Sequence, residues 1–423
     1  MSIESTFSRT PETDIPPIVT PLLFNLKTKR KDNNSITLDK QLGKGGFGTV
    51  YLCHNENKEE LAVKCIKTKD FGIPSLVEAS IMATIRHPNL SYALKIHSTP
   101  QKLYIVQELA LSDLKVYRNF NNIDYNTTVL WTYNIIQGLK CLHDYDIIHG
   151  DLKASNILVY PDHKIKITDY TLSTHKKWKN DFRPCTPTHR PLEVWLGEKW
   201  DESVDIWALG CTIFELIYGV PLFVNQTKDA SINALIDWHN YLPRQYKSPD
   251  ILLIKREAFH YTFSFPVSFY ISNPLDNLIL SLLVISPRGR PNIDEISNNE
   301  LFKPYYTSPP SFINNPVTIL PPKTESKVRK SISTLLSNNN TIELAYNIYT
   351  CLTGMINGND KIKLITCAWI ANKIVERENI SLSVLSVELH EILQMERMIC
   401  NYLSYRLYCK STQVVFHERK LEK

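Results

Sequence analysis

The chain has 423 residues, of which 43% are hydrophobic and 22% are charged, a composition that excludes collagen-like, coiled-coil and disordered proteins. Its 48 lysines and arginines against 43 aspartates and glutamates give a formal net charge of +5, too small and too dispersed to indicate a nucleic-acid-binding protein. A chain of this length is expected to fold into two or three structural units.

The apolar segments and the cysteines predict an intracellular protein with neither a membrane nor a nucleic acid as partner. The most apolar stretch, 206–214, is bounded by Asp205 and Glu215 and is too short to span a bilayer. The first 14 residues lack the basic and apolar regions of a secretory signal. Nine scattered cysteines without a Cys-x-x-Cys pair favour reduced core thiols over a disulfide framework or a zinc site. We therefore expect the chain in the cytoplasm or the nucleus.

Composition and periodicity divide the chain into five segments. These are a polar tail, a two-lobed domain, a proline-rich linker, a helical domain and a short tail, at residues 1–35, 36–305, 306–326, 327–416 and 417–423. In the large domain, short β-branched and aromatic runs up to about residue 106 predict strands. Trp131, Ile135 and Leu139 then recur at helical spacing. This order predicts an α+β fold with a small β-rich lobe, up to about residue 110, and a large helical lobe.

A glycine-rich segment lies near the start of the predicted β-rich lobe. Residues 43–50 read Gly-Lys-Gly-Gly-Phe-Gly-Thr-Val, and glycines let backbone N–H groups approach phosphate oxygens closely. A hairpin without a ligand is the alternative interpretation of this motif taken alone. A β-branched run follows the last glycine in place of a helix, which disfavours a dinucleotide-binding fold.

Two charged residues follow on the next predicted elements. Lys64 lies in an alternating β run, where one long cation among apolar neighbours can bind a phosphate; an exposed strand lysine is the alternative. Glu78 lies in the helical segment 76–82 and can orient the ammonium group of Lys64, although a single helix glutamate is usually just solvated.

The segment 148–158 carries the strongest signal in the sequence. It places Asp151, Lys153 and Asn156 in one loop, and Asp169 follows 13 residues after Asn156. Two carboxylates and an amide that converge can hold Mg²⁺ and accept a hydroxyl proton.

These motifs, in this order, resemble those of eukaryotic protein kinases over residues 37–305. The resemblance implies that Asp151 is the catalytic base. Lys153, two residues later, is similar to the catalytic loop of the serine/threonine type. Asn156 and Asp169 would be the Mg²⁺ ligands.

The same resemblance implies an ATP site between the lobes. Lys64 would hold the α- and β-phosphates and pair with Glu78, and the hinge backbone would bind adenine behind Gln107 as gatekeeper. The implied ATP-binding residues are Leu42, Gly43, Lys44, Gly45, Gly46, Phe47, Gly48, Thr49, Val50, Lys64, Glu108 and Ala110. An ion pair between Arg290 and Glu193 would close the activation segment.

Three positions depart from the kinase pattern. The usual His-Arg-Asp reads His149-Gly150-Asp151, so the arginine that normally binds a phosphorylated residue of the activation segment is absent. Asp-Phe-Gly reads Asp169-Tyr170-Thr171, with a β-branched residue in place of the flexible glycine. Ala-Pro-Glu reads Pro191-Leu192-Glu193, and Asp181 stands where such kinases often carry the phosphoacceptor. We expect that phosphorylation there no longer activates the protein.

The C-terminal segment resembles a single cyclin box. Ala368–Lys373 is similar to its third helix and Gln394–Leu407 to its fifth. The resemblance implies that Lys373 and Glu396 form the surface that grips a kinase. A plain helical extension packed on the large lobe is the alternative, as is a tail that recruits a partner protein.

The kinase segment points to the same group. Residues 72–78, Gly-Ile-Pro-Ser-Leu-Val-Glu, are similar to the Pro-Ser-Thr-Ala-Ile-Arg-Glu helix of cyclin-dependent kinases, and Leu76 would be the apolar contact with a cyclin. The hypothesis is a serine/threonine kinase that transfers the γ-phosphoryl group of ATP to protein hydroxyls and carries its own activator, in cis or in a second chain. The alternative is a nucleotide-binding pseudokinase scaffold. A preference for serine or threonine before proline would follow from the group, although residues 187–189 depart from its pattern.

Overall fold

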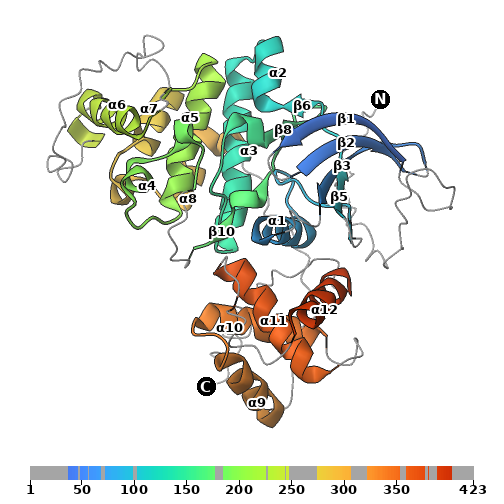
Figure 1. The fold of residues 1–423 in the computed structure, drawn as a ribbon. Coiled ribbons are helices and arrows are strands. Elements are labelled where there is room, and N and C mark those ends of the chain that lie inside the picture. The colour runs from blue at the N-terminus through green and yellow to red at the C-terminus, as the bar shows by residue number, and fades with distance from the viewer. Residues whose placement is uncertain are drawn as a thin grey trace, which may run out of the picture.

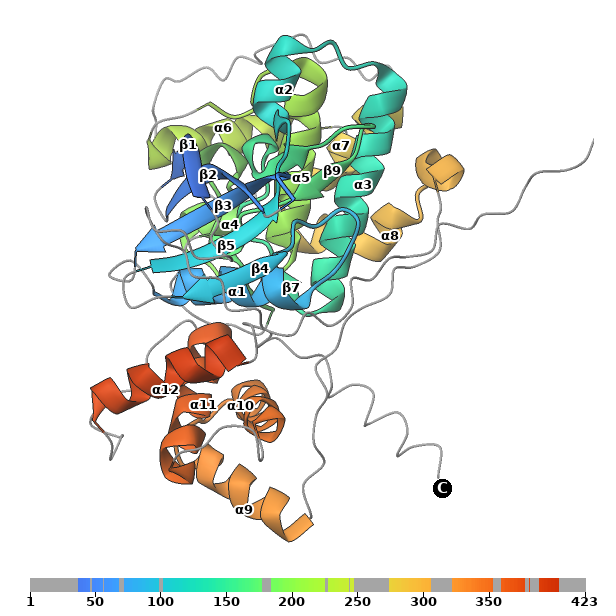
Figure 2. The same cartoon turned by 90° about the vertical axis from the view of Figure 1, so that its right-hand side faces the viewer.

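The computed structural model describes residues 37–45, 48–55, 57–67, 72–98, 102–176, 184–224, 227–242, 244–246, 274–305, 322–352, 359–376, 380 and 388–402. Figures 1 and 2 show a small lobe built on a β-sheet, a larger helical lobe beside it, and a third group of helices below α1. The predicted arrangement of a small β-rich lobe followed by a large helical lobe is confirmed.

The small lobe is a five-stranded antiparallel sheet in the order β1-β2-β3-β5-β4. Its strands are β1 (Thr37–Gly45), β2 (Gly48–His54), β3 (Glu60–Lys67), β4 (Lys95–Ser98) and β5 (Lys102–Glu108). Side chains alternate across a strand, so Val63 and Cys65 of β3 join one apolar cluster while Ile66 joins the main core. This alternation determines which face of the sheet receives Lys64.

Helix α1 (Ile73–Thr84) covers one face of this sheet. Pro74 occupies its first turn, where a proline needs no N–H group. Every residue from Ser75 to Thr84 is buried, so neighbours surround the helix on all sides. Two of these neighbours are the turn at Tyr170–Leu172 and a C-terminal helix, α11 (Asp360–Val375).

The large lobe is mainly helical. Its helices are α2 (Leu114–Phe120), α3 (Tyr125–Asp144), α4 (Leu192–Leu196), α5 (Ser203–Tyr218), α6 (Lys228–Tyr241), α7 (Pro274–Leu282) and α8 (Ile293–Ser297). Its short strands are β6 (Ser112–Asp113), β7 (Ile147–Ile148), β8 (Ile157–Val159), β9 (Ile165–Ile167) and β10 (Thr174–His175). The predicted apolar stripe of α3 is buried, since Trp131, Ile135 and Leu139 are at most 1% exposed.

The remaining described residues form α9 (Pro322–Ser333), α10 (Asn339–Cys351), α11 and α12 (Leu389–Tyr402). Helix α9 starts inside the segment predicted as a linker, because a proline fits the first turn of a helix; residues 306–321 lie outside the described part. Helix α11 packs between α10 and α12, and its small residues Cys367, Ala368 and Ala371 are fully buried. The prediction of a central buried helix here is confirmed.

One continuous cluster of buried apolar side chains joins α1, the large lobe and the C-terminal helices. Helix α11 packs against α1 and β10, and α12 packs against β4. The cysteines that the structure describes are buried and unpaired: Cys53, Cys65, Cys141, Cys185, Cys211, Cys367 and Cys400. Among the described helices, none has the length and apolarity needed to cross a bilayer.

Candidate active site

A partly buried ion pair connects β3 to α1 in the small lobe. Nζ of Lys64, on β3, lies 2.6 and 2.8 Å from the two carboxylate oxygens of Glu78, on α1. Nζ also lies 3.6 Å from Oδ1 of Asp169, in the loop after β9. Burial alone would lower the pKa of Lys64, but the two carboxylates raise it above its usual value, so the lysine is an ammonium ion. The Lys64–Glu78 pair is formed as the sequence predicts, and Asp169 lies beside it.

The loop after β7 holds Asp151 in a dense set of hydrogen bonds. Lys153 donates to Oδ2 of Asp151 over 2.7 Å, and the amide of Asn156 donates to the same oxygen over 3.0 Å. The backbone N–H and the hydroxyl of Thr186 donate to Oδ1 over 2.9 and 2.7 Å. Lys153 also donates to the Thr186 hydroxyl over 2.7 Å. Charge-assisted bonds of this kind fix the carboxylate in one orientation.

Asp205, at the start of α5, stabilises this loop through hydrogen bonds to its backbone. Its carboxylate is fully buried and accepts hydrogen bonds from the backbone N–H groups of His149 and Gly150 over 2.7 and 2.9 Å. The imidazole of His143 lies 2.9 Å from the same carboxylate. The sequence did not indicate this supporting role of Asp205, because it depends on contacts between residues 55 and 56 positions apart.

Gly150 adopts a backbone conformation that suits glycine. Its φ is +75°, in the left-handed region, and a Cβ atom there would lie 2.7 Å from the carbonyl oxygen of Leu172. The activation segment therefore runs close against the catalytic loop at this point. Cys185, later in the same segment, donates its backbone N–H to the Gly150 carbonyl over 2.6 Å.

Asp169 and Asn156 offer the oxygen ligands that Mg²⁺ prefers. Burial alone would raise the pKa of Asp169, but Lys64, Thr171, His149 and Lys153 together lower it, so this carboxylate is anionic. The amide nitrogen of Asn156 is used in hydrogen bonds to Asp151, and within the described part of the chain no hydrogen bond engages its Oδ1. The residues present therefore fit a bound magnesium ion.

The glycine-rich segment forms the hairpin between β1 and β2, in which Gly45 pairs with Gly48. A Cβ on Gly48 would lie 2.9 Å from the carbonyl oxygen of Cys65, so no larger residue fits there without a shift. Val50 pairs directly with Lys64 across β2 and β3, which brings the hairpin beside the ion pair. Gly46 and Phe47 lie outside the described residues.

The predicted hinge lies at the end of β5 and just beyond it. The side chain of Glu108 accepts two hydrogen bonds. Lys166 of β9 donates to it over 2.5 Å, and the Tyr92 hydroxyl donates to it over 3.2 Å. Ala110 follows β5 and is half-buried. The gatekeeper position, Gln107, accepts a hydrogen bond from the Ser91 hydroxyl over 3.0 Å.

The end of the activation segment is closed by the predicted ion pair. The Arg290 guanidinium makes two parallel hydrogen bonds to Glu193, of 2.7 and 2.9 Å, and both side chains are buried. This prediction is confirmed. Asp181 lies outside the described residues.

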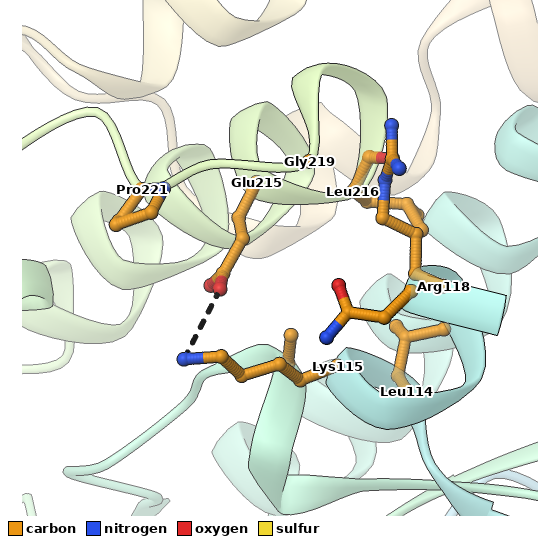
Figure 3. Close-up of a pocket in the computed structure, with 9 residues that line it drawn as sticks. Leu114, Lys115, Arg118, Glu215, Leu216, Gly219 and Pro221 are labelled. Carbon is orange, nitrogen blue, oxygen red and sulfur yellow. Dashed lines mark hydrogen bonds and ion pairs between the residues drawn. The ribbon is translucent and has the colours of Figure 1, made fainter. Parts of the chain in front are cut away.

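A pocket of about 50 Å³ lies below the catalytic loop, between α2 and the end of α5. Figure 3 shows Lys115 and Glu215 pointing toward one another there, 3.8 Å apart, while Arg118 points toward Leu216. Arg118 donates to the carbonyls of Leu216 and Ile217, which end α5. Among the described residues that line this pocket, none is a predicted ATP-site residue.

The predicted cyclin contacts lie on two helices of the C-terminal group. Lys373 of α11 and Glu396 of α12 are 7% and 4% exposed and pair with each other over 2.8 and 2.9 Å. Leu76 of α1 is fully buried in the shared apolar cluster. Residues 403–416, part of the resemblance to a cyclin box, lie outside the described chain.

Comparisons with known proteins agree with this geometry. A family model described as "Protein kinase domain" matches residues 36–302, which ends before the C-terminal helices. Fission yeast (Schizosaccharomyces pombe) "Cell division control protein 7" is 31% identical over 229 residues, 51% of this chain and 21% of that protein. Rat (Rattus norvegicus) "Cyclin-dependent kinase-like 2" is 29% identical over 227 residues, 49% of this chain and 44% of that protein.

"Serine/threonine-protein kinase polo" of Drosophila melanogaster is 26% identical over 273 residues, 62% of this chain and 43% of that protein. The chain thus spans less than half the length of each of these three relatives. The matched residues contain the Lys64–Glu78 pair, the Asp151 loop and the Arg290–Glu193 pair. The chain belongs to the protein kinase domain family.

Proposed function

We infer that the chain is an active serine/threonine protein kinase that transfers the γ-phosphoryl group of ATP to protein hydroxyls and is activated by its own C-terminal helices. One observation carries this conclusion. The Lys64–Glu78 pair is formed at 2.6 Å, on a helix against which α11 packs. This pair requires α1 to be pressed toward β3, which is the condition that an activator has to meet.

The proposal assigns a role to each of five polar residues that the fold brings together. ATP would supply the transferable phosphoryl group, and a bound Mg²⁺ ion would neutralise part of its charge. Asn156 and Asp169 would hold the metal ion, and Lys64 the α- and β-phosphates. Asp151, oriented by hydrogen bonds, would accept the proton of the substrate hydroxyl. Lys153 donates to Asp151, and its ammonium group would neutralise negative charge on the transferred phosphoryl group.

The Thr186 hydroxyl supports the role assigned to Asp151. It donates to Oδ1 of Asp151 over 2.7 Å, so a hydroxyl group already occupies the hydrogen-bonding position that a substrate hydroxyl would need. The short loop that carries Thr186 therefore borders the place where a protein substrate would lie. The sequence did not single out this residue as functional.

The C-terminal helices support activation in cis. Their apolar side chains share one core with α1, and α11 reaches both α1 and β10, near the start of the activation segment. Tethering makes this contact intramolecular, with an effective concentration in the mM range for a short flexible linker. We propose that residues 327–416 act as a cyclin-like domain and that the buried Lys373–Glu396 pair shapes the surface that α11 and α12 turn toward the kinase lobes.

The backbone beside Thr186 supports a proposed preference for substrates with proline after the acceptor. Cys185 has a φ of +70°, and its carbonyl accepts hydrogen bonds from Arg190 over 2.7 and 3.1 Å. That carbonyl is therefore engaged and cannot accept the N–H of a substrate residue. Proline has no N–H to leave unpaired, so we expect about a tenfold preference for Ser-Pro over Ser-Ala peptides, and a smaller one in Arg190→Met.

A pseudokinase scaffold is the second candidate, favoured by Gly150 and Thr171 at positions where kinases normally have arginine and glycine. The two functions differ in one measurement. The full chain with Mg-ATP and a generic protein acceptor should incorporate phosphate, and Asp151→Asn should abolish this, whereas exposed Asp162→Asn should not. Nucleotide binding without any transfer by the wild-type chain would favour the scaffold.

A further inference from the structure

Three hydroxyl side chains fasten the segment that follows β9. Tyr170, Thr171 and Ser173, which we call the hydroxyl clamp, are at most 2% exposed. The Tyr170 hydroxyl donates to the carbonyls of Ile167 and Ser91. The Thr171 hydroxyl donates to the Asp169 carboxylate, and the Ser173 hydroxyl donates to the His149 carbonyl. Three buried hydroxyls in four residues, all satisfied, indicate a fixed conformation.

Tyr170 ties this segment to the small lobe. Its hydroxyl lies 2.8 Å from the carbonyl oxygen of Ile167 and 3.1 Å from that of Ser91, so one proton serves two acceptors. The Ser91 N–H donates to the Ile167 carbonyl over 2.8 Å, and the Ser91 hydroxyl donates to Gln107 of β5. A phenylalanine at position 170 could make none of the hydroxyl bonds.

Thr171 acts directly on the metal-binding carboxylate. Its hydroxyl lies 2.8 Å from Oδ1 of Asp169, the same oxygen that faces Lys64 at 3.6 Å. Asp169 has a φ of +63°, a left-handed conformation that a residue with a side chain adopts only when its surroundings hold it there. With Oδ1 held by Thr171 and facing Lys64, within the described part of the chain no hydrogen bond engages Oδ2.

Ser173 anchors the other end of the clamp to the catalytic loop. Its hydroxyl donates to the His149 carbonyl over 2.9 Å, one residue before Gly150. The Leu172 carbonyl lies where a side chain at position 150 would begin. A side chain at position 150 would therefore clash with the backbone of the segment that carries the clamp.

We propose that the hydroxyl clamp is a positioning device that keeps Asp169 facing the cleft and holds the start of the activation segment without a phosphate. The inference rests on the proposed function, because Asp169 has a metal to hold only in an active or nucleotide-binding kinase. Departure of Asp169 from the cleft breaks buried hydrogen bonds, and each lost bond shifts such an equilibrium about 2- to 10-fold. The clamp residues are positioning residues, since their hydroxyls act through Asp169 and through backbone carbonyls.

The test compares four variants of the full chain. Tyr170→Phe and Thr171→Ala each remove one clamp hydroxyl, Thr171→Ser keeps it, and Thr212→Ala is the matched control. Thr212 is a fully buried threonine of α5 whose hydroxyl donates to the Ala208 carbonyl, far from the clamp in sequence.

Two readouts separate positioning from general stability. Amide hydrogen exchange of residues 168–173 without nucleotide should accelerate about 2- to 10-fold in Tyr170→Phe and Thr171→Ala, and not in Thr212→Ala. The free Mg²⁺ concentration for half-maximal binding of a non-hydrolysable ATP analogue should rise about 2- to 10-fold in Thr171→Ala and return in Thr171→Ser. Phosphatase treatment should leave wild-type activity unchanged.

Different outcomes would overturn the clamp and the proposed function on which it rests. Unchanged exchange in both clamp variants, an equal change in Thr212→Ala, or loss of activity after phosphatase treatment overturns the clamp. No binding of the Mg²⁺-analogue pair by the wild-type chain overturns the proposed function and with it the metal-positioning role of Thr171. The exchange measurement then still decides whether the hydroxyls hold the segment.

Discussion

Lys166 of β9 reaches behind the hinge and donates to Glu108 of β5 over 2.5 Å, which joins the large lobe to the small lobe. The Lys166 ammonium lies over the rings of Tyr92 and Tyr160, 4.9 and 5.0 Å from their centres. A cation flanked by two aromatic rings and paired with a carboxylate has a restricted position. We expect this contact to hold β9 of the large lobe against β5 of the small lobe.

Lys166→Met should loosen this connection. Because Glu108 is 39% exposed at its side chain, solvent screening keeps the contribution to about 1 kcal/mol, or about 2–4 °C in melting temperature. Nucleotide affinity should fall about threefold if adenine binds at the predicted hinge, as proposed. Calorimetry with an ATP analogue measures the affinity, and Lys164→Met, a solvent-exposed lysine, is the control. Equal affinities of the Lys166 and Lys164 variants would contradict this role.

Glu78→Gln should leave the chain folded and reduce phosphotransfer by about 100-fold or more, because Lys64 loses the carboxylate that orients its ammonium group. Steady-state kinetics with a protein acceptor measure the loss, and circular dichroism checks the fold. Glu60→Gln on β3, a largely exposed glutamate, should keep wild-type rates. A Glu78 variant with wild-type turnover would remove the central support of the proposed function.

Removal of residues 322–423 should uncover the apolar side chains of α1 that α11 covers. We expect at least a tenfold loss of turnover, because α1 is no longer pressed toward β3. Addition of the separate helical segment in trans should restore part of the rate at high concentration. Unchanged turnover together with the loss of a bound partner would instead support recruitment by the tail.

Gly150→Ala should destabilise the protein by more than 1 kcal/mol. The backbone there has a φ of +75°, and the new methyl group would meet the Leu172 carbonyl at 2.7 Å. Urea unfolding measures the change, and Gly43→Ala, where a Cβ atom meets nothing within 4 Å, is the comparison for stability. A Gly150 variant as stable as wild type would mean that the activation segment does not press on this loop.

His87 should make stability fall with acid. Burial lowers the pKa of this histidine to about 4, whereas the unfolded chain protonates it near 6.5. Between these values the unfolded state binds more protons, so stability is full above pH 6.5 and declines as the pH falls toward 4. At pH 5 the loss from this group is about 2 kcal/mol. Urea unfolding of wild type and His87→Asn at pH 7.5 and pH 5 should show a smaller decline in the variant; parallel declines would refute the assignment.

The sequence predicted the contacts that have fixed motifs and missed those that depend on packing. The Lys64–Glu78 and Arg290–Glu193 pairs follow from residue types at recognisable positions, and both are formed. The Lys166–Glu108 contact does not, because it joins residues 58 apart whose side chains meet only once the lobes have folded.

Hydroxyl groups were the least predictable part of the site. Tyr170 was noted as a departure from Asp-Phe-Gly, but its partners are backbone carbonyls, which no sequence pattern marks. No motif in the sequence singled out Thr186, although its hydroxyl contacts Asp151. Helix α9 begins at Pro322, inside the segment 306–326 predicted as a linker.

The apolar core shared by α1 and α11 has a thermodynamic consequence. Two structural units connected only by a flexible tether unfold independently on heating. Units that share a buried apolar core unfold in one cooperative step, because unfolding of either unit exposes the shared surface. Heating should therefore produce a single calorimetric transition for the sheet lobe and the C-terminal helices. Under the proposed function, the amount of active enzyme would then follow the balance between its synthesis and its degradation, because the proposed activator is part of the same chain.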